Sequence, residues 1–116
     1  MSKTFLKSLK TFESDITGEM REYKVNNMVW LYLEAKHKLS QGKWAAGIAE
    51  NQTLYGSYFV AGVMKANGIE VTHKEVLENT NIIEIENFIT AFQTQALDLE
   101  DLNKEDETEG STDEGE

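Results

Sequence analysis

The pattern between Thr72 and Leu99 predicts two consecutive helices, the second with a continuous apolar face. From Ile82 onward, apolar side chains recur every three or four residues, which is the spacing of one helix face. They are Ile82, Ile85, Ile89, Phe92, Ala96 and Leu99. The stripe is shorter than the three to four heptads that indicate a coiled coil. We therefore expect the rest of the domain to cover it, with a partner-binding seam as the alternative.

Both of these helices have a start signal. Thr72 is followed three residues later by Glu75, and Asn81 three residues later by Glu84. At this spacing the first side chain can accept from the backbone N–H of the glutamate. The glutamate can in turn accept from the N–H of the cap residue. Each pair therefore predicts a capping box.

Two further helices are expected in the middle of the chain. One begins at Asn26 or Asn27 and ends near Leu39. Its predicted inner stripe is Val25, Met28, Val29, Tyr32, Ala35 and Leu39, with Trp30 and Leu33 off the stripe. The other begins at Asn51 or Thr53, is apolar on most sides and should be buried, and Asn67-Gly68 should end it. Between them, residues 43–50 are expected to form a single helical turn.

The first 25 residues fit two structures. Phe5, Leu9, Phe12 and Ile16 have helical spacing, but Phe12, Ser14 and Ile16 also alternate as in a strand. Thr17-Gly18-Glu19 is typical of a tight turn, and residues 21–25 alternate again. We favour a β-hairpin around Gly18 over a helix that ends there.

These elements predict a mainly α (α+β) fold, a small bundle of about four helices with a short N-terminal β-hairpin. We expect one helical domain, residues 1–99, followed by an acidic tail, residues 100–116. Beyond Leu102 the chain has no apolar residue and is rich in Glu, Asp, Gly, Ser and Thr. Such a segment cannot bury enough apolar surface to offset its ordering entropy, so we expect the tail to be disordered.

The charge is concentrated at the C-terminus. The 116 residues carry a net charge of −10. Residues 98–116 contain ten acids and one lysine, whereas residues 1–97 contain eleven acids and ten bases. A nearly neutral folded part argues against binding to nucleic acid or to an anionic membrane. No apolar run approaches the ~20 residues of a membrane span, and the N-terminus has no long apolar segment of a secretory signal. We expect a cytoplasmic protein.

No residue pattern indicates catalysis, a metal site or a cofactor. Cysteine is absent. His37 and His73 are far apart in sequence, and each is explained more simply as a residue near a helix end. We therefore expect a non-enzymatic binding protein. Tryptophan and tyrosine are favoured at binding hot spots, so the candidate partner-binding residues are Trp30, Trp44, Tyr55 and Tyr58, although each also fits a core position.

The order of elements resembles the small tail assembly chaperones of long-tailed bacteriophages. The resemblance covers roughly residues 19–97. It includes the short Arg-Glu-Tyr-Lys-Val strand that leads into a helix ending in Lys-Leu-Ser-Gln-Gly, and then the apolar helix of residues 54–66. It continues with Lys65-Ala-Asn-Gly-Ile-Glu-Val-Thr-His-Lys-Glu-Val-Leu77, a final amphipathic helix and an acidic tail.

This resemblance implies a protein that acts in the host bacterial cytoplasm during virion assembly and is absent from the mature virion. Such chaperones bind the tape measure protein and keep it soluble while tail tube subunits polymerise around it. The tape measure protein is thus the expected partner, with contacts to the tail tube protein and self-association as further expectations. The family offers no catalytic residues to carry over.

A rival interpretation is a small acidic inhibitor that mimics nucleic acid and binds a host nucleic-acid-binding protein. Such a mimic needs carboxylates fixed on a folded surface at roughly phosphate spacing. In this sequence most of the excess acids are in the expected tail, which counts against a mimic. A small enzyme is the third and least favoured class.

Overall fold

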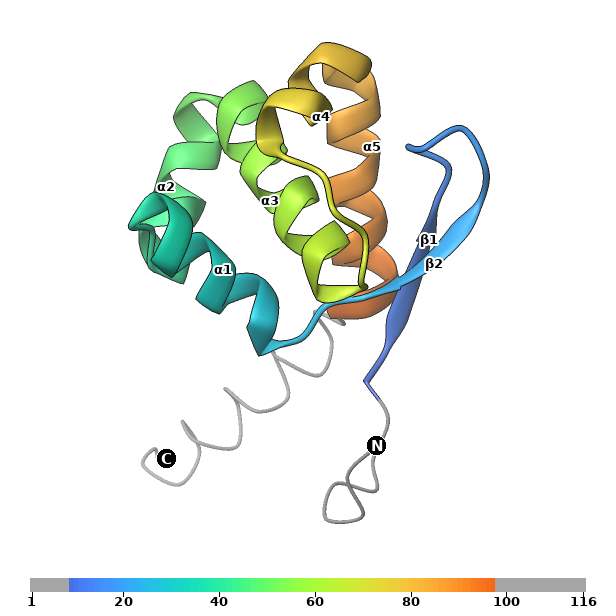
Figure 1. Cartoon of the computed structure of the whole chain (residues 1–116), viewed down its shortest axis with the longest axis horizontal. Coiled ribbons are helices and arrows are strands. Elements are labelled where there is room, and N and C mark those ends of the chain that lie inside the picture. The colour runs from blue at the N-terminus through green and yellow to red at the C-terminus, as the bar shows by residue number, and fades with distance from the viewer. Residues whose placement is uncertain (1–8, 98–116) are drawn as a thin grey trace, which may run out of the picture.

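The computed structural model describes residues 9–97, in which a β-hairpin packs against a group of helices (Figure 1). The elements in order are β1 (Thr11–Ser14), β2 (Arg21–Lys24), α1 (Asn27–His37), α2 (Gln41–Glu50), α3 (Gln52–Ala66), α4 (His73–Asn79) and α5 (Ile82–Ala91). A π-helical segment, Phe92–Leu97, continues α5. The predicted mainly α fold with an N-terminal hairpin is confirmed. The predicted acidic tail and Leu99 lie outside the described residues.

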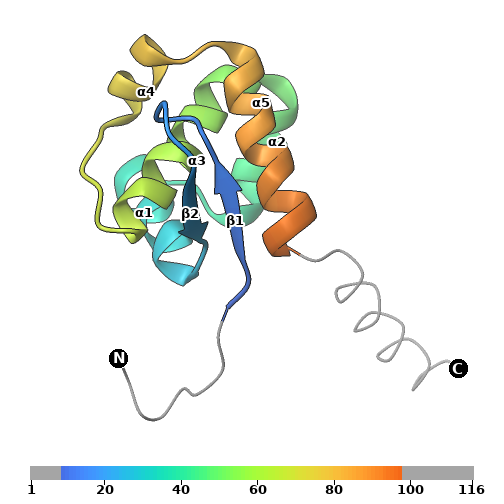
Figure 2. The same cartoon turned by 90° about the vertical axis from the view of Figure 1, so that its right-hand side faces the viewer.

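Helix α3 is the centre of the fold. It contacts α1, α2, α4, α5 and β2, and both views show it between the other helices (Figures 1 and 2). Its buried residues run without a break from Phe59 to Met64. A helix that is apolar on most sides is stable only when other elements cover it, and the predicted burial of this helix is confirmed.

The hairpin is held by aromatic packing. Its antiparallel register places Phe12 opposite Tyr23, and both side chains are buried. The Phe12 ring lies 5.0 Å from the Phe88 ring of α5, centroid to centroid, in an edge-to-face arrangement. In the turn, Gly18 has a φ of 104° and its N–H donates to the carbonyl of Asp15. Because two strands alone are marginal in water, this packing is what makes the predicted hairpin stable.

Asn67 ties the hairpin to the end of α3. The N–H of Lys24 donates to Asn67 Oδ1 over 3.1 Å, and Asn67 Nδ2 donates to the Lys24 carbonyl over 2.9 Å. The same Nδ2 donates to the carbonyl of Val63 over 2.7 Å. The amide thus occupies the edge of β2 as a neighbouring strand would, while Gly68, with a φ of 81°, turns the chain away.

Both predicted capping boxes are present. Thr72 Oγ1 accepts from the N–H of Glu75 over 3.1 Å, and the Glu75 carboxylate accepts from the N–H of Thr72 over 3.0 Å. Asn81 and Glu84 form the same reciprocal pair, with both bonds at 2.9 Å. The C-cap of α4, Thr80, comes directly before the second box and has an extended backbone. The boxes therefore fix where the chain turns from α4 into α5.

Loss of the first box is expected to destabilise the protein. Thr72→Ala should lower the free energy of unfolding by about 1 kcal/mol, because the N–H of Glu75 loses its acceptor. Urea titrations of the two proteins measure this difference. Thr72→Ser keeps the hydroxyl and should stay close to wild type, whereas an alanine variant with an unchanged midpoint would contradict the capping role.

The predicted inner face of α1 is wrong in part. The residues of α1 that are buried are Val29 and Leu33, while Met28 and Ala35 are exposed. Helix α1 meets α3 at Gly62, where a Cβ would lie 3.3 Å from Val29 Cγ1. This close approach turns the Val29–Leu33 side of the helix inward. Leu33 therefore belongs to the core, and Trp30 is half-buried beside it.

Two further expectations are corrected. Ile82, assigned to the inner stripe of α5, is exposed, whereas Phe88, outside that stripe, is fully buried. Residues 43–50 form most of a ten-residue helix, α2, rather than a single turn. The reason is a cap, since Ser40 Oγ accepts from the N–H of Lys43 over 3.2 Å and starts a new helix where only the end of α1 was expected.

Candidate partner-binding surface

The structure brings the four aromatic candidates together along the junction of α1, α2 and α3. The Trp30 and Trp44 rings lie 5.6 Å apart, edge to face, and both contact Phe59 of α3. The Tyr55 and Tyr58 rings, both on α3, lie 5.5 Å apart, centroid to centroid. The four residues, which come from three different helices, thus form two ring pairs, and the Trp44 side chain is connected to the Tyr55 backbone.

The four candidates differ in how accessible they are. Trp44 is only 7% exposed, and its indole N–H donates to the carbonyl of Tyr55 over 2.9 Å. The Tyr55 ring lies on Gly47 of α2, where any Cβ would overlap it. Trp44 therefore joins α2 to α3 as a core residue does. Trp30, Tyr55 and Tyr58 are half-buried and keep part of their surface accessible, and a role of the four in binding stays a prediction.

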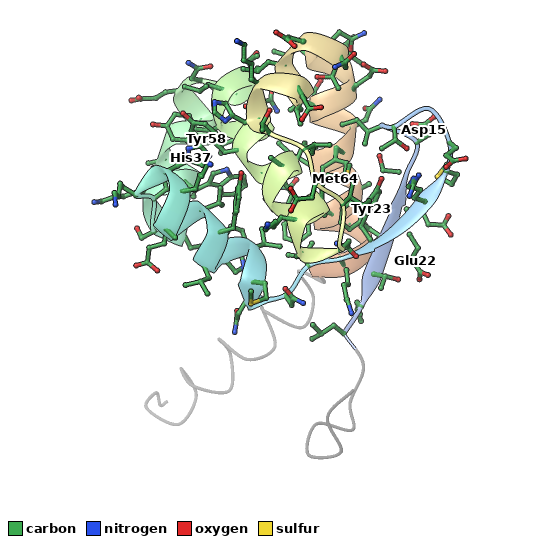
Figure 3. All side chains as sticks on the ribbon, viewed as in Figure 1. Asp15, Glu22, Tyr23, His37, Tyr58 and Met64 are labelled. Atoms are coloured by element: carbon green, nitrogen blue, oxygen red, sulfur yellow. The ribbon has the colours of Figure 1, made fainter. Side chains whose placement is uncertain are left out.

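Two histidines that are distant in sequence meet beside Tyr58. His37, at the end of α1, stacks on the Tyr58 ring with centroids 3.7 Å apart. His73, at the start of α4, lies 5.0 Å from both rings and roughly perpendicular to them. Figure 3 shows His37 and Tyr58 side by side. The contact connects α1, α3 and α4, which sequence spacing alone could not indicate.

The environment of His37 disfavours its protonated form. Its Nε2 atom is buried without a hydrogen-bond partner among the described residues. Burial lowers the pKa of His37 below its usual value of 6.5, and the neighbouring His73 and Lys36 lower it further. The neutral imidazole is thus the form that fits the folded protein.

Low pH should therefore destabilise the folded protein through protonation of His37. Because the folded pKa of His37 is below the unfolded one, its contribution to stability is complete above about pH 6.5 and is lost as the pH falls towards the folded pKa. We expect the melting temperature to fall between about pH 7.5 and about pH 5. His37→Phe, which can still stack on Tyr58, should show a smaller fall, and equal falls in the two proteins would contradict this assignment.

A cleft of about 360 Å³ lies on a different side, between the turn of the hairpin, α3 and α4. Its apolar lining is Ile16, Val60, Met64, Ile69, Val71 and Val76. Glu75 and Asn79 of α4 add polar groups at the same site. Figure 3 labels Met64 on α3 and Asp15 at the turn of the hairpin, on either side of this region.

Large apolar side chains are exposed near this cleft. Met20, beside the hairpin turn, is 63% exposed, and Ile83, at the start of α5, is 60% exposed. Ile82 beside it is also exposed, and Thr80, two residues earlier, lines the cleft. The hairpin turn, α4 and the start of α5 all lie at the same end of the molecule (Figures 1 and 2). A second exposed pair, Met28 and Leu31, lies on α1.

The charges of the folded part are segregated. Residues 13–22 carry four acids and one arginine, and residues 75–86 carry four acids and no base, a net −7 for the two segments. The rest of residues 9–97 carries three acids and seven bases, a net +4. The two acidic segments are those that supply Ile16 and Val76 to the cleft. The near-neutral total therefore conceals an acidic region made by these two segments, and Glu75 of this region lines the apolar cleft.

Sequence reasoning missed this second surface. Its lining comes from segments more than 40 residues apart, so no local pattern could reveal it. The available signals were the Ile82-Ile83 pair at a helix start and the eight acids of the two segments.

Similarity to known proteins does not identify a function for this chain. Neither a family model nor a curated protein nor a solved structure matches the chain. Among residues 9–97, no three His, Cys, Asp or Glu side chains are close enough together to hold a metal ion. Within that same part of the chain, no helix has both the length and the apolar character needed to cross a bilayer.

Proposed function

We propose that this protein is a phage tail assembly chaperone that binds the tape measure protein and keeps it soluble while the tail tube assembles. The observation that carries the proposal is the exposed apolar surface of a small helical domain, with an apolar cleft and Met20, Ile82 and Ile83 at one end of it. The resemblance of residues 19–97 to this family supports the same conclusion. We propose that it acts in the bacterial cytoplasm.

The physical role of such a surface is to cover apolar segments of a client before assembly. Contiguous exposed apolar patches on soluble proteins mark interaction sites or aggregation sites. Burial of apolar area gives roughly 25 cal/mol per Å², so a client segment is protected in proportion to the area covered. The nine net negative charges of residues 98–116 would favour solubility of the complex.

Co-expression with the tape measure protein of the same phage tests this proposal. Full-length protein should increase the soluble fraction of the tape measure protein, and a chain that ends at Asn103 should still bind it. We expect truncation to change mainly the solubility, the association rate and the salt dependence of the complex. Failure of the full-length protein to increase solubility would contradict the proposal. If the full-length chain bound the tape measure protein and the truncated chain did not, the binding site would lie in the tail.

The acidic region gives the rival function one supporting observation. Its eight carboxylates are fixed on the hairpin and on α4 and α5, as a mimic of nucleic acid would require. A mimic would rely on charge, so its binding to a basic host protein should weaken steeply with salt and tolerate Ile82→Ser with Ile83→Ser. A chaperone should be sensitive to that double substitution.

A further inference from the structure

We infer that the cleft between the hairpin turn and α4 is the docking site for an amphipathic helix of the partner, with lysines or arginines beside its apolar face. This inference rests on the proposed function, because it names the kind of client segment that the chaperone would recognise. We call the cleft, together with Met20, Ile82 and Ile83, the acidic-end site.

The shape of the site fits apolar side chains that project from one face of a helix. Its volume of about 360 Å³ is within the range of about 300–1,000 Å³ that is usual for binding pockets. Its apolar walls come from the hairpin, from α3 and from the linker before α4. Helices bind to grooves through anchors at positions i, i+3, i+4 and i+7. Met20, beside the hairpin turn, and Ile82 and Ile83, at the start of α5, are further exposed apolar side chains that a partner could cover.

The charged residues near the cleft indicate which charge the partner segment should carry beside its apolar face. The segments that line or adjoin the cleft, residues 13–22 and 69–86, carry nine acids and two bases, Arg21 and Lys74, and Arg21 is already paired with Glu19 over 3.0 Å. Glu75 lines the cleft itself, so cations beside the apolar face of a partner would meet a negative charge there.

The same charges argue against the other occupants available to this chain. Residues 98–116 carry ten acids and one lysine, so they would be repelled from the acidic-end site. A second copy that presents the same face in a two-fold dimer would bring seven net negative charges against seven more. A separate, cationic amphipathic segment is the occupant that the charges favour.

The experiment uses the full chain and two synthetic helices of eighteen residues, one of leucine and lysine and one of leucine and glutamate with the same pattern. Fluorescence anisotropy of labelled peptide gives the affinity, and amide shifts in ¹⁵N spectra locate the site. We expect the lysine peptide to bind and to shift the amides of Ile16, Val76 and Asn79. The glutamate peptide should bind at least about tenfold more weakly. If only amides of residues 98–116 shift, the inference is overturned.

Matched variants separate apolar docking from general attraction to an acidic protein. Ile82→Ser with Ile83→Ser should weaken binding of the lysine peptide at least about tenfold. The control is Met28→Ser with Leu31→Ser, which removes two equally exposed apolar side chains from α1 and should change affinity less than about twofold. Equal losses in the two variants, or a loss in the control alone, overturn the inference.

Charge reversal gives the second matched comparison. Asp15→Lys with Glu78→Lys changes two acids of the segments that flank the cleft, whereas Glu34→Lys with Glu50→Lys changes two acids on α1 and α2. The net charge of the protein is the same in both variants. Only the first pair should slow association of the lysine peptide strongly, and equal effects overturn the inference.

The inference and the proposed function can fail separately. If the lysine peptide binds at the cleft but the tape measure protein stays insoluble on co-expression, the docking chemistry holds and the proposed function is wrong. If the tape measure protein is kept soluble equally well by the Ile82→Ser, Ile83→Ser variant, the function holds and the acidic-end site is wrong.

Discussion

Phe88→Ala is expected to lower the free energy of unfolding by about 3–5 kcal/mol, the usual range for a phenylalanine removed from a core. Phe88 is fully buried on α5. Its ring lies 5.0 Å from Phe12, 5.7 Å from Tyr23 and 6.0 Å from Phe59, centroid to centroid. One side chain therefore connects both strands of the hairpin to α3 and α5, and its loss leaves a cavity at the point where they meet.

The control for this substitution lies on the same helix. Ile82→Ala also removes a large apolar side chain, but Ile82 is 51% exposed, so its loss should change the free energy of unfolding by less than about 1 kcal/mol. Urea titration monitored by circular dichroism measures both. Because the total stability of a small domain is about 5–15 kcal/mol, the alanine variant at Phe88 should unfold at a much lower urea concentration. Similar losses at the two positions would show that Phe88 is not a central contact.

The features that the sequence predicted well are those set by neighbouring residues. A capping box needs only two side chains three residues apart, so Thr72 with Glu75 and Asn81 with Glu84 could be identified without knowledge of the fold. The turn at Gly18 was similarly local. The alternation of Phe12, Ser14 and Ile16 agrees with that turn and favours a hairpin over a helix, and tertiary packing stabilises the hairpin.

The faces of α1 and α5 could be predicted only in part. Ile85, Ile89 and Phe92 of the predicted stripe are buried, but the apolar residues are not sparse enough to define a single face. Residues 28–33 read Met-Val-Trp-Leu-Tyr-Leu, six apolar side chains in succession. Such a run has no helical period, so the packing partner decides which side is buried. Gly62 of α3 lets Val29 approach and turns Leu33 inward. On α5, the hairpin rings select Phe88 rather than Ile82.

The two candidate surfaces also differ in how far the sequence could predict them. Residue type was enough to single out Trp30, Trp44, Tyr55 and Tyr58, which the structure places as two ring pairs on α1, α2 and α3. The cleft depends on Ile16 meeting Val76, which are 60 residues apart. The total charge of the folded part was read as nearly neutral, because averaging over the sequence conceals which charges become neighbours.

Gly56→Ala is expected to destabilise the protein by about 1–3 kcal/mol, although alanine is the better helix former. Gly56 is buried in α3, and a Cβ at this position would overlap Cγ2 of Ile85 and lie 3.5 Å from Cδ1 of Ile89. Both isoleucines are buried on α5. A β-branched side chain held in a packed core has few alternative rotamers, so relief of the overlap requires α3 and α5 to move apart.

Gly42→Ala provides the opposite case in the same protein. Gly42 lies in the first turn of α2, and a Cβ there would meet no other atom within 4 Å. Alanine should therefore stabilise the protein by up to about 1 kcal/mol, because it restricts the unfolded chain without steric overlap. Thermal melts of the two variants should move in opposite directions. If both variants were stabilised, α3 and α5 would be less closely packed at Gly56 than the structure indicates, since helix propensity alone would then explain both results.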